Sequence, residues 1–298
     1  PSSSRNWKLR LTPVPRTVNE SPFDNLPPLS QKDALQILST PINKLNLISD
    51  YYKAVFHLVK YPGTKTENAL LDLVQSVSDE LAVSIARRKA IEGLARLGCQ
   101  AAIPAIGECL KSSDPYLVEI AAWALNELAC KDLYLHKAME RLLDDPRQNR
   151  RALIKSLAGL GVVSAESRIR SFLTEESISV GIRGASIAAL SALTGEKSYL
   201  KELEDYLKLP NQNERVCAIT YVIDAGATDL LSVIIRLPVA PSFRLMAMNK
   251  LWPKNVLTYN QFGLFEALDF LLRDNPAELE TLNMYDQYPS EEILVEDL

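Results

Sequence analysis

The chain has 298 residues, of which 47% are hydrophobic, and it carries a formal net charge of −4 with a pI near 5.5. This length and composition suffice for a large core or a repeat array. The acidic balance argues against a nucleic-acid partner. No apolar run approaches the roughly 20 residues of a membrane helix, and the first residues lack a secretory signal, so we expect no membrane insertion.

The four cysteines and two histidines occur singly. This pattern fits neither a zinc site nor a disulfide framework, so we predict no bound metal and a reducing, cytosol-like compartment. His57 is expected to be packed or solvated rather than catalytic. Cys99 and Cys109 are expected to be buried small hydrophobic residues. The sequence contains no G-x-S-x-G, P-loop, H-E-x-x-H or dinucleotide-binding motif.

Residues 1–29 contain six of the 17 prolines. Because proline lacks the amide donor that a helix needs, we expect this segment to be irregular. From Ser30 the pattern changes, since SQKDALQILSTP has an N-cap serine, apolar residues at helical spacing and a proline stop. A helical array is expected over residues 30–275, ending in a capping helix at 264–274 and followed by an acidic tail at 276–298.

A helical pattern recurs about every 32 residues from residue 50 onward. Each copy has an aliphatic anchor, preceded four positions earlier by a small or apolar residue. The anchors are Leu58, Leu94, Leu125, Leu157, Leu190, Val222 and Leu251. The preceding residues are Ala54, Ala90, Ala121, Leu153, Ser186, Ala218 and Ala247. Four copies end in a glycine suited to a left-handed cap, namely Gly98, Gly161, Gly195 and Gly226.

Second amphipathic segments, such as KAMERLLDD and YLKELEDYLKL, lie between these copies. A pair of helices that repeats at this length cannot bury both its faces alone, so neighbouring pairs must stack and share a core. No alternation typical of strands competes with this pattern. We therefore predict an all-α protein, an α-solenoid of about six to seven HEAT-like helical-hairpin repeats.

An arginine recurs three positions before the small residue of five copies. These are Arg87, Arg150, Arg183, Arg215 and Arg244. The column could bind a ligand, and Arg87 is kept as a candidate contact. We favour a structural role, because HEAT repeats commonly place an arginine here beside a loop aspartate, and Asp145 lies suitably before Arg150.

Positions −2 and +2, counted from the small residue, share a helix face that points away from the predicted core. In the first four copies they hold Tyr52 and Phe56, Arg88 and Glu92, Glu119 and Trp123, and Arg151 and Lys155, which we call the strip. The next copies have Gly184 and Ala188, Val216 and Thr220, and Leu245 and Asn249. A stacking role would repeat along the array, so the uneven strip indicates a ligand surface, and a solvated face with incidental ion pairs is the alternative. Trp123 is expected to be exposed, with Tyr116 beside it.

Four segments of the sequence are similar to the E/F-type bilin lyases, and most of all to their phycoerythrin-directed members. They are SDYYKAVFHLVKYP, ARRKAIEGLARLGCQAAIPAIGECLKSSDPYLVEIAAWALNEL, GASIAALSALTGEKSYL and RLPVAPSFRLMAMNKLW. The resemblance spans roughly residues 31–255. KYPGTKTENALLDLV and VEIAAWA depart from the common wording of the family, and the NHCQGN-like motif of one related lyase-isomerase is missing.

The resemblance implies that the protein attaches a linear tetrapyrrole, phycoerythrobilin, by a thioether to a cysteine of a phycobiliprotein subunit, phycoerythrin α. Isomerisation to phycourobilin stays open. The pigment is then a substrate, and no prosthetic group is expected. A second lyase or chaperone subunit is a further expected partner. The location implied is the cyanobacterial cytoplasm or the plastid stroma.

On this interpretation the strip supplies the chemistry. Glu119 would hold protonated pyrrole nitrogens, with Glu92 as a second proton shuttle. Arg88 and Arg151 would grip the propionates. The pigment rings would stack on Trp123, Tyr116 and Tyr52. The alternative is a non-catalytic HEAT-repeat chaperone or scaffold for phycobiliprotein assembly.

Overall fold

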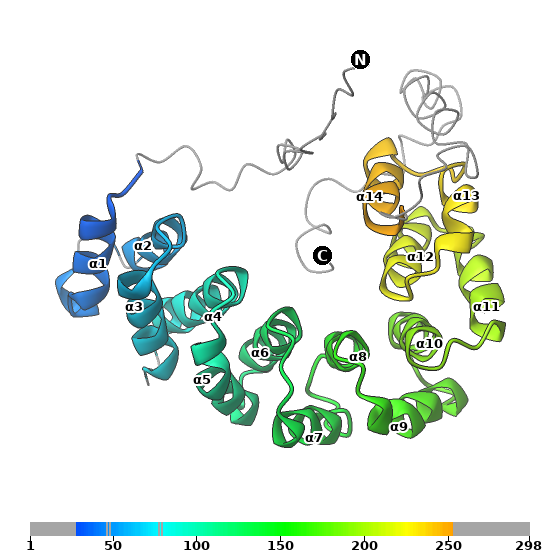
Figure 1. The fold of residues 1–298 in the computed structure, drawn as a ribbon, viewed down its shortest axis with the longest axis horizontal. Coiled ribbons are helices and arrows are strands. Elements are labelled where there is room, and N and C mark those ends of the chain that lie inside the picture. The colour runs from blue at the N-terminus through cyan, green and yellow to red at the C-terminus, as the bar shows by residue number, and fades with distance from the viewer. Residues whose placement is uncertain (1–27, 46, 48, 77, 79, 253–298) are drawn as a thin grey trace, which may run out of the picture. The chain divides into compact units, whose positions relative to one another are not determined.

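A computed structural model describes residues 28–252, apart from 46, 48, 77 and 79. The described residues form fourteen α-helices joined by turns and short 3-10 segments, without strands among them (Figure 1). The all-α prediction is therefore confirmed. The expected capping helix at 264–274, the acidic tail and most of the proline-rich segment lie outside the described residues.

The helices alternate between a first and a second helix of each repeat, giving seven of each in the described part of the chain. The first helices are α1 (Gln31–Ser39), α3 (Thr64–Gln75), α5 (Ile103–Glu108), α7 (Leu133–Leu142), α9 (Glu166–Ser171), α11 (Ser198–Leu207) and α13 (Leu231–Ile234). The second helices are α2 (Asp50–Leu58), α4 (Leu81–Arg96), α6 (Pro115–Glu127), α8 (Arg150–Gly159), α10 (Val180–Thr194), α12 (Gln212–Asp224) and α14 (Pro241–Leu251). The 3-10 segments are Ile42–Lys44, Gln100–Ala102, Cys109–Lys111, Val163–Ala165, Phe172–Thr174 and Thr228–Leu230.

The residues of the repeat pattern form the core of the described part of the protein. All seven anchors and all seven residues four positions before them are buried. The small residues let neighbouring helices approach closely, and the anchors fill the space between them. Truncating a fully buried anchor such as Leu125 to alanine would cost about 2–5 kcal/mol.

A left-handed residue ends or follows five of the seven second helices that the structure describes. The four predicted cap glycines all have positive φ, between 62° and 71°. In α8, for example, the amide of Gly161 donates to Ala158 and the amide of Val162 donates to Leu157, which is the pattern of a Schellman cap. In α6 the same two bonds form around Ala129, a residue with a side chain held at φ 49°.

The arginine column is structural, as favoured from the sequence, but its partners differ from the prediction. The guanidinium groups donate to backbone carbonyls near the ends of the first helices. Arg87 donates to Val74, Arg150 to Asp144, Arg183 to Leu173, Arg215 to Leu209, Pro210 and Pro238, and Arg244 to Ile235. Asp145, expected beside Arg150, instead accepts from Arg147 at 2.8 Å. Backbone carbonyls can accept these hydrogen bonds because the last turn of a helix leaves them without helical partners.

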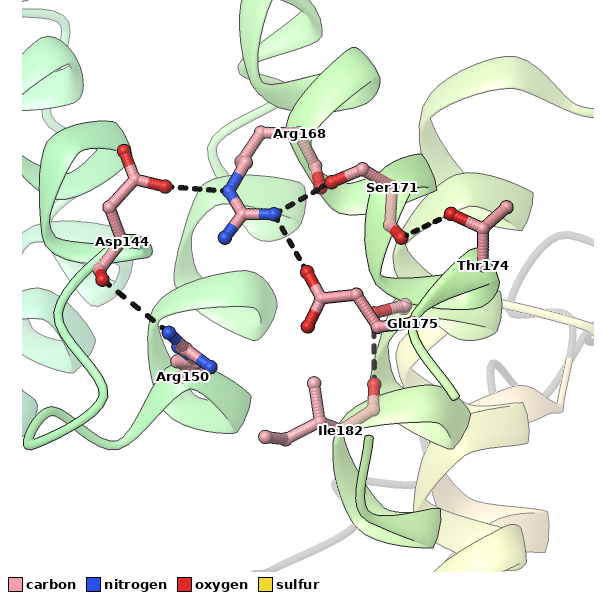
Figure 2. Close-up of polar contacts among 8 residues, drawn as sticks. Asp144, Arg150, Arg168, Ser171, Thr174, Glu175 and Ile182 are labelled. Carbon is pink, nitrogen blue, oxygen red and sulfur yellow. Dashed lines mark hydrogen bonds and ion pairs between the residues drawn. The ribbon is translucent and has the colours of Figure 1, made fainter. Parts of the chain in front are cut away.

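Further polar contacts tie neighbouring repeats together (Figure 2). Arg168 of α9 bonds to Asp144, which follows α7, at 2.7 Å, and to Glu175 at 3.1 Å. Its guanidinium also lies 4.2 Å from the ring centre of buried Phe172. These contacts fix one repeat against the next without using the faces of the second helices.

The described residues fall into two compact units, of which the first ends at Cys109 and the second begins at Leu110. Within the second unit, α6, α8, α10, α12 and α14 form one row on its concave side, and the first helices form the other row (Figure 1). Helix α10 packs against α8 and against α12. This row carries the second half of the strip.

Candidate functional site

The strip residues fall into two groups, one in each unit. In the first unit, Glu92 of α4 forms ion pairs with Lys89 at 2.8 Å and Arg96 at 2.5 Å within its own helix. Lys89 also lies over the ring of Phe56 on α2, 5.7 Å from its centre. Burial, and then the charge of Glu92, raise the pKa of Tyr52. The aromatic pair of α2 and the charged face of α4 are therefore neighbours.

Arg87, kept as a candidate contact from the sequence, makes a structural contact within the first unit. Two of its nitrogens, Nε and Nη2, donate to the carbonyl of Val74 at 3.2 and 3.0 Å. Its charge and a hydrogen bond also act on the thiol of buried Cys109, whose pKa is raised by burial despite them. These contacts support the structural role of Arg87, whose guanidinium holds a helix end inside the first unit. Its assignment as a pigment contact stays a prediction.

In the second unit, the site begins on one face of α6. Tyr116, Glu119 and Trp123 follow one another at spacings of three and four residues, so their side chains share that face. Tyr116 is 63% exposed, whereas Glu119 and Trp123 are half-buried. The tryptophan is thus less exposed than the sequence suggested.

Glu119 is held by the next repeat. Its Oε2 accepts a hydrogen bond from Nδ2 of Asn149 at 3.0 Å. The same asparagine caps α8, since its Oδ1 accepts from the amide of Ala152 at 3.2 Å. Because a glutamate side chain has several rotatable bonds, this contact to a fixed cap limits where its carboxylate can lie.

The faces of α8 and α12 meet above α10. Lys155 of α8 pairs with Asp224 of α12 at 2.9 Å. Burial raises the pKa of Asp224, and the charges of Lys155 and Arg151 oppose that rise. These side chains can meet because α10 presents small residues there, with Ala185, Ala188 and Ala189 lying beside the Lys155 and Asp224 pair.

Tyr221 of α12 lies directly on Gly184 of α10. A Cβ at Gly184 would come within 2.3 Å of the tyrosine ring. The hydroxyl of Tyr221 donates to the carbonyl of Gly181 at 3.3 Å. Burial raises its pKa to about 12, although Arg151 opposes the rise through its charge and a hydrogen bond. The loss of the strip pattern at Gly184 therefore has a structural cause, since a neighbouring repeat covers this position.

A pocket of about 480 Å³ opens at the beginnings of α8, α10 and α12. Its walls include Arg151, Tyr206, Asn213, Glu214, Cys217 and Tyr221. The Tyr206 and Tyr221 rings meet edge to face, with centres 6.2 Å apart. Cys217 is half-buried, whereas Cys99, Cys109 and Cys130 are buried, as expected for the first two of these. The volume lies within the range of about 300–1,000 Å³ that is usual for small-molecule sites.

Of the pocket walls, Arg151 was assigned to the binding site from the sequence, and Arg150 to the arginine column. Tyr206, Glu214 and Tyr221 were missed because they lie outside positions −2 and +2 of their helices. The signal that could have found them is the glycine pair in α10, Gly181 and Gly184, where neighbouring copies have larger residues. Small residues on one helix can let the side chains of its two neighbours meet.

The described helices are not membrane spans, because none of them is both long enough and apolar enough to cross a bilayer. His57, excluded above as a catalytic residue, is 3% exposed and lies within α2. Its ring contacts Phe56 edge to face, with the ring centres 5.4 Å apart. It is therefore a core residue of the first unit.

The described part of the chain is thus a HEAT-like repeat array, and comparisons with known proteins agree with this fold. The family model for the PBS lyase HEAT-like repeat matches residues 86–112. The bilin biosynthesis protein CpeY of Synechococcus sp. (strain WH8020) is 38% identical over 251 residues, which are 84% of this chain and 59% of CpeY. The phycocyanobilin lyase subunit alpha of Thermosynechococcus vestitus (strain NIES-2133 / IAM M-273 / BP-1) is 32% identical over 204 residues, 62% of this chain and 72% of that protein.

A solved structure shows the same architecture. The complex of CpcE and CpcF of phycocyanin lyase from Nostoc sp. PCC7120 contains a chain that matches with a TM-score of 0.70 and 26% identity, over 86% of this chain and 98% of that one. The chain belongs to the E/F-type phycobilin lyase family. It spans about three fifths of the length of CpeY.

Proposed function

We propose that this protein is a bilin lyase, which binds a linear tetrapyrrole and attaches it to a cysteine of a phycobiliprotein subunit. The observation that carries the proposal is the polar face of the second unit. There Tyr116, Glu119 and Trp123 share one side of α6, and Arg151 follows at the start of α8. Aromatic surfaces, a carboxylate and a guanidinium are the groups that a planar pigment with basic nitrogens and two propionates requires.

The reaction needs no nucleophile from this chain. The acceptor cysteine adds as a thiolate to the exocyclic ethylidene of the pigment, so that a carbon–sulfur bond forms as the carbon–carbon double bond opens. A proton taken up by the pigment balances the one that the thiol loses. The task of the lyase is to place one face of the pigment toward the thiol and to favour its protonated, electrophilic form.

Glu119 is the residue that we assign to the pyrrole nitrogens. Asn149 donates to one of its carboxylate oxygens, which orients the group while leaving it an acceptor. Trp123 and Tyr116 would stack on the rings beside it. The first unit carries candidate pigment contacts of its own, Arg88 and Tyr52, with Glu92 as the second proton shuttle.

Phycoerythrobilin and phycoerythrin α are the proposed substrate and acceptor. Their support is the resemblance to phycoerythrin-directed lyases and the identity to CpeY. A second lyase subunit is a proposed partner, because the matching solved structure is a complex of two chains. Isomerisation to phycourobilin would be an additional outcome of the same reaction.

Co-expression with phycoerythrobilin synthesis and with candidate α and β subunits tests the function. We expect a coloured peptide whose mass contains the pigment on one acceptor cysteine, and its spectrum distinguishes phycoerythrobilin from phycourobilin. Glu119→Gln and Trp123→Ala should together abolish the transfer with helicity unchanged. If the chain only raises the solubility of the acceptor, it is a chaperone, and if it does neither, it is a scaffold.

A further inference from the structure

The pocket between α8, α10 and α12 has the electrostatic character of an anion site. Three helices begin at it, with N-caps Asn149, Ser179 and Asn211. They are 10, 15 and 13 residues long. Each helix start carries the equivalent of roughly half a positive charge. Their positive ends therefore converge on one small volume.

Arginine side chains add to this field. Arg151 lines the pocket, and so does Arg150 of the structural column. One carboxylate, Glu214, opposes them within the wall. The guanidinium of Arg151 has five donors in one plane, so it can contact Tyr221 and a bound carboxylate at the same time. The pocket walls therefore carry more positive than negative charge, which favours a bound anion.

The remaining walls fit a flat, unsaturated group next to that anion. The edge-to-face rings of Tyr206 and Tyr221 form a rigid aromatic corner, because Tyr221 is fixed on Gly184. Glu214 and Asn213 offer acceptors for N–H groups. A simple inorganic anion would use the positive ends and leave the aromatic corner empty.

We propose that this pocket binds a propionate-bearing ring of the linear tetrapyrrole, with the carboxylate on Arg151 and the helix starts and the ring against Tyr206 and Tyr221. This inference rests on the proposed function, because it takes the pigment as the ligand of the chain. It adds a subsite of named residues to the face of α6. Anchoring by one propionate would fix which end of the pigment extends toward the acceptor thiol.

Cys217 allows the subsite to be tested in the unmodified protein. It lines the pocket and is half-buried, whereas the other three cysteines of the chain are buried. The full chain is alkylated with iodoacetamide, with and without biliverdin, a linear tetrapyrrole with two propionates, and the rate at each cysteine is read by mass spectrometry. We expect biliverdin to slow the alkylation of Cys217, and biliverdin dimethyl ester to protect it at least tenfold less well at equal concentration.

Absorbance titration adds a comparison of variants. Arg151→Gln should weaken the binding of biliverdin about tenfold or more and leave that of the ester unchanged, since the ester carries no charge for the guanidinium to hold. Arg151→Lys, which keeps the charge, should recover part of the affinity if the loss in Arg151→Gln is electrostatic. Arg147→Gln is the matched control, because Arg147 is an exposed loop arginine outside the pocket.

Three results would overturn the subsite: absence of biliverdin binding, binding that leaves the alkylation of Cys217 unchanged, and equal protection by the acid and its ester. The lyase proposal is judged separately, by covalent transfer to the acceptor. Transfer without protection of Cys217 would retain the function and reject this pocket. Protection without transfer would retain the pocket and reject the catalytic role.

Discussion

Lys155 of α8 and Asp224 of α12 form a 2.9 Å ion pair across the intervening helix α10. The pair shows that α8 and α12, which are not consecutive second helices, contact each other directly. Small residues on α10 make the contact possible, since Ala185, Ala188 and Ala189 lie beneath it. The same arrangement, one turn earlier, brings Arg151 to Tyr221 and forms the pocket wall.

The ion pair gives a prediction about pH. Burial raises the pKa of Asp224, so ionisation of this carboxyl opposes folding. The resulting loss of folding stability develops as the pH rises above the ordinary carboxyl pKa of about 3.9. Lys155 reduces this loss once Asp224 is ionised. Lys155→Gln should therefore destabilise the protein near pH 7 by up to about 1 kcal/mol, because Lys155 is half exposed. It should have little effect at about pH 3.5, where the carboxyl of Asp224 in the folded protein is mostly protonated and Lys155 has no charge to pair with.

Urea unfolding of the wild type, the two single variants and the double variant measures this effect. In an Asp224→Asn background, Lys155→Gln should cost nothing at either pH. A loss that persists in this background would mean that Lys155 stabilises the fold through packing of its methylene chain and not through the carboxylate.

Ala129 gives a prediction about backbone strain. It occupies the left-handed cap position of α6 at φ 49°, where four other repeats have glycine. A side chain in this conformation costs the folded state about 1–2 kcal/mol. A change to glycine removes this cost, but the greater freedom of glycine in the unfolded chain offsets part of the gain. Ala129→Gly should stabilise the protein by about 0.5–1 kcal/mol in urea unfolding.

The reverse exchange at Gly161 is the matched control. A Cβ there would meet no atom within 4 Å, so Gly161→Ala tests conformation alone and should destabilise by a similar amount. If Ala129→Gly lowers the stability, the alanine methyl group has a packing role that outweighs its strain.

Gly184 gives a prediction about the pocket. Gly184→Ala would place a Cβ 2.3 Å from the ring of Tyr221, and because that ring is buried, the change should cost about 1–3 kcal/mol. Gly181→Ala, three residues earlier, meets Tyr221 and Arg151 only at 3.7 and 3.9 Å and should be tolerated. Adding Tyr221→Ala should remove most of the difference between the two alanine variants in urea unfolding, and failure to do so would place the clash elsewhere.

These contacts mark the limit of what the sequence predicts. Periodicity identified the core correctly, because pairs such as Ala121 and Leu125 recur at helical spacing and are buried. It could not identify the partner of Arg150, since a backbone carbonyl has no signature in a sequence. It also could not predict the contact between Arg151 and Tyr221, which lie 70 residues apart in the sequence. They meet only because α10 has small side chains between them. Trp123 was placed on the correct helix, but its partial burial was not predicted.

Arg215 gives a prediction about the arginine column. It is buried and donates to the carbonyls of Leu209, Pro210 and Pro238. Arg215→Met keeps much of the volume but leaves these acceptors without the guanidinium, so it should cost about 2–4 kcal/mol in urea unfolding. Arg147→Met, on an exposed loop arginine, should change the stability by less than about 0.5 kcal/mol. Equal losses of stability in the two variants would contradict a structural role of the arginine column.

Asn149 has two roles, which different atoms of its side chain serve. Its Oδ1 caps α8, and its Nδ2 orients Glu119. Variants of this residue can therefore test the two roles separately. Serine caps helices as well as asparagine but has no amide to donate to the carboxylate. Asn149→Ser should therefore keep the stability within about 0.5 kcal/mol while it lowers the rate of pigment transfer in the co-expression assay. Asn149→Ala should lose about 1 kcal/mol as well. Transfer at the wild-type rate by Asn149→Ser would show that Glu119 acts without this contact, or that it does not act on the pigment.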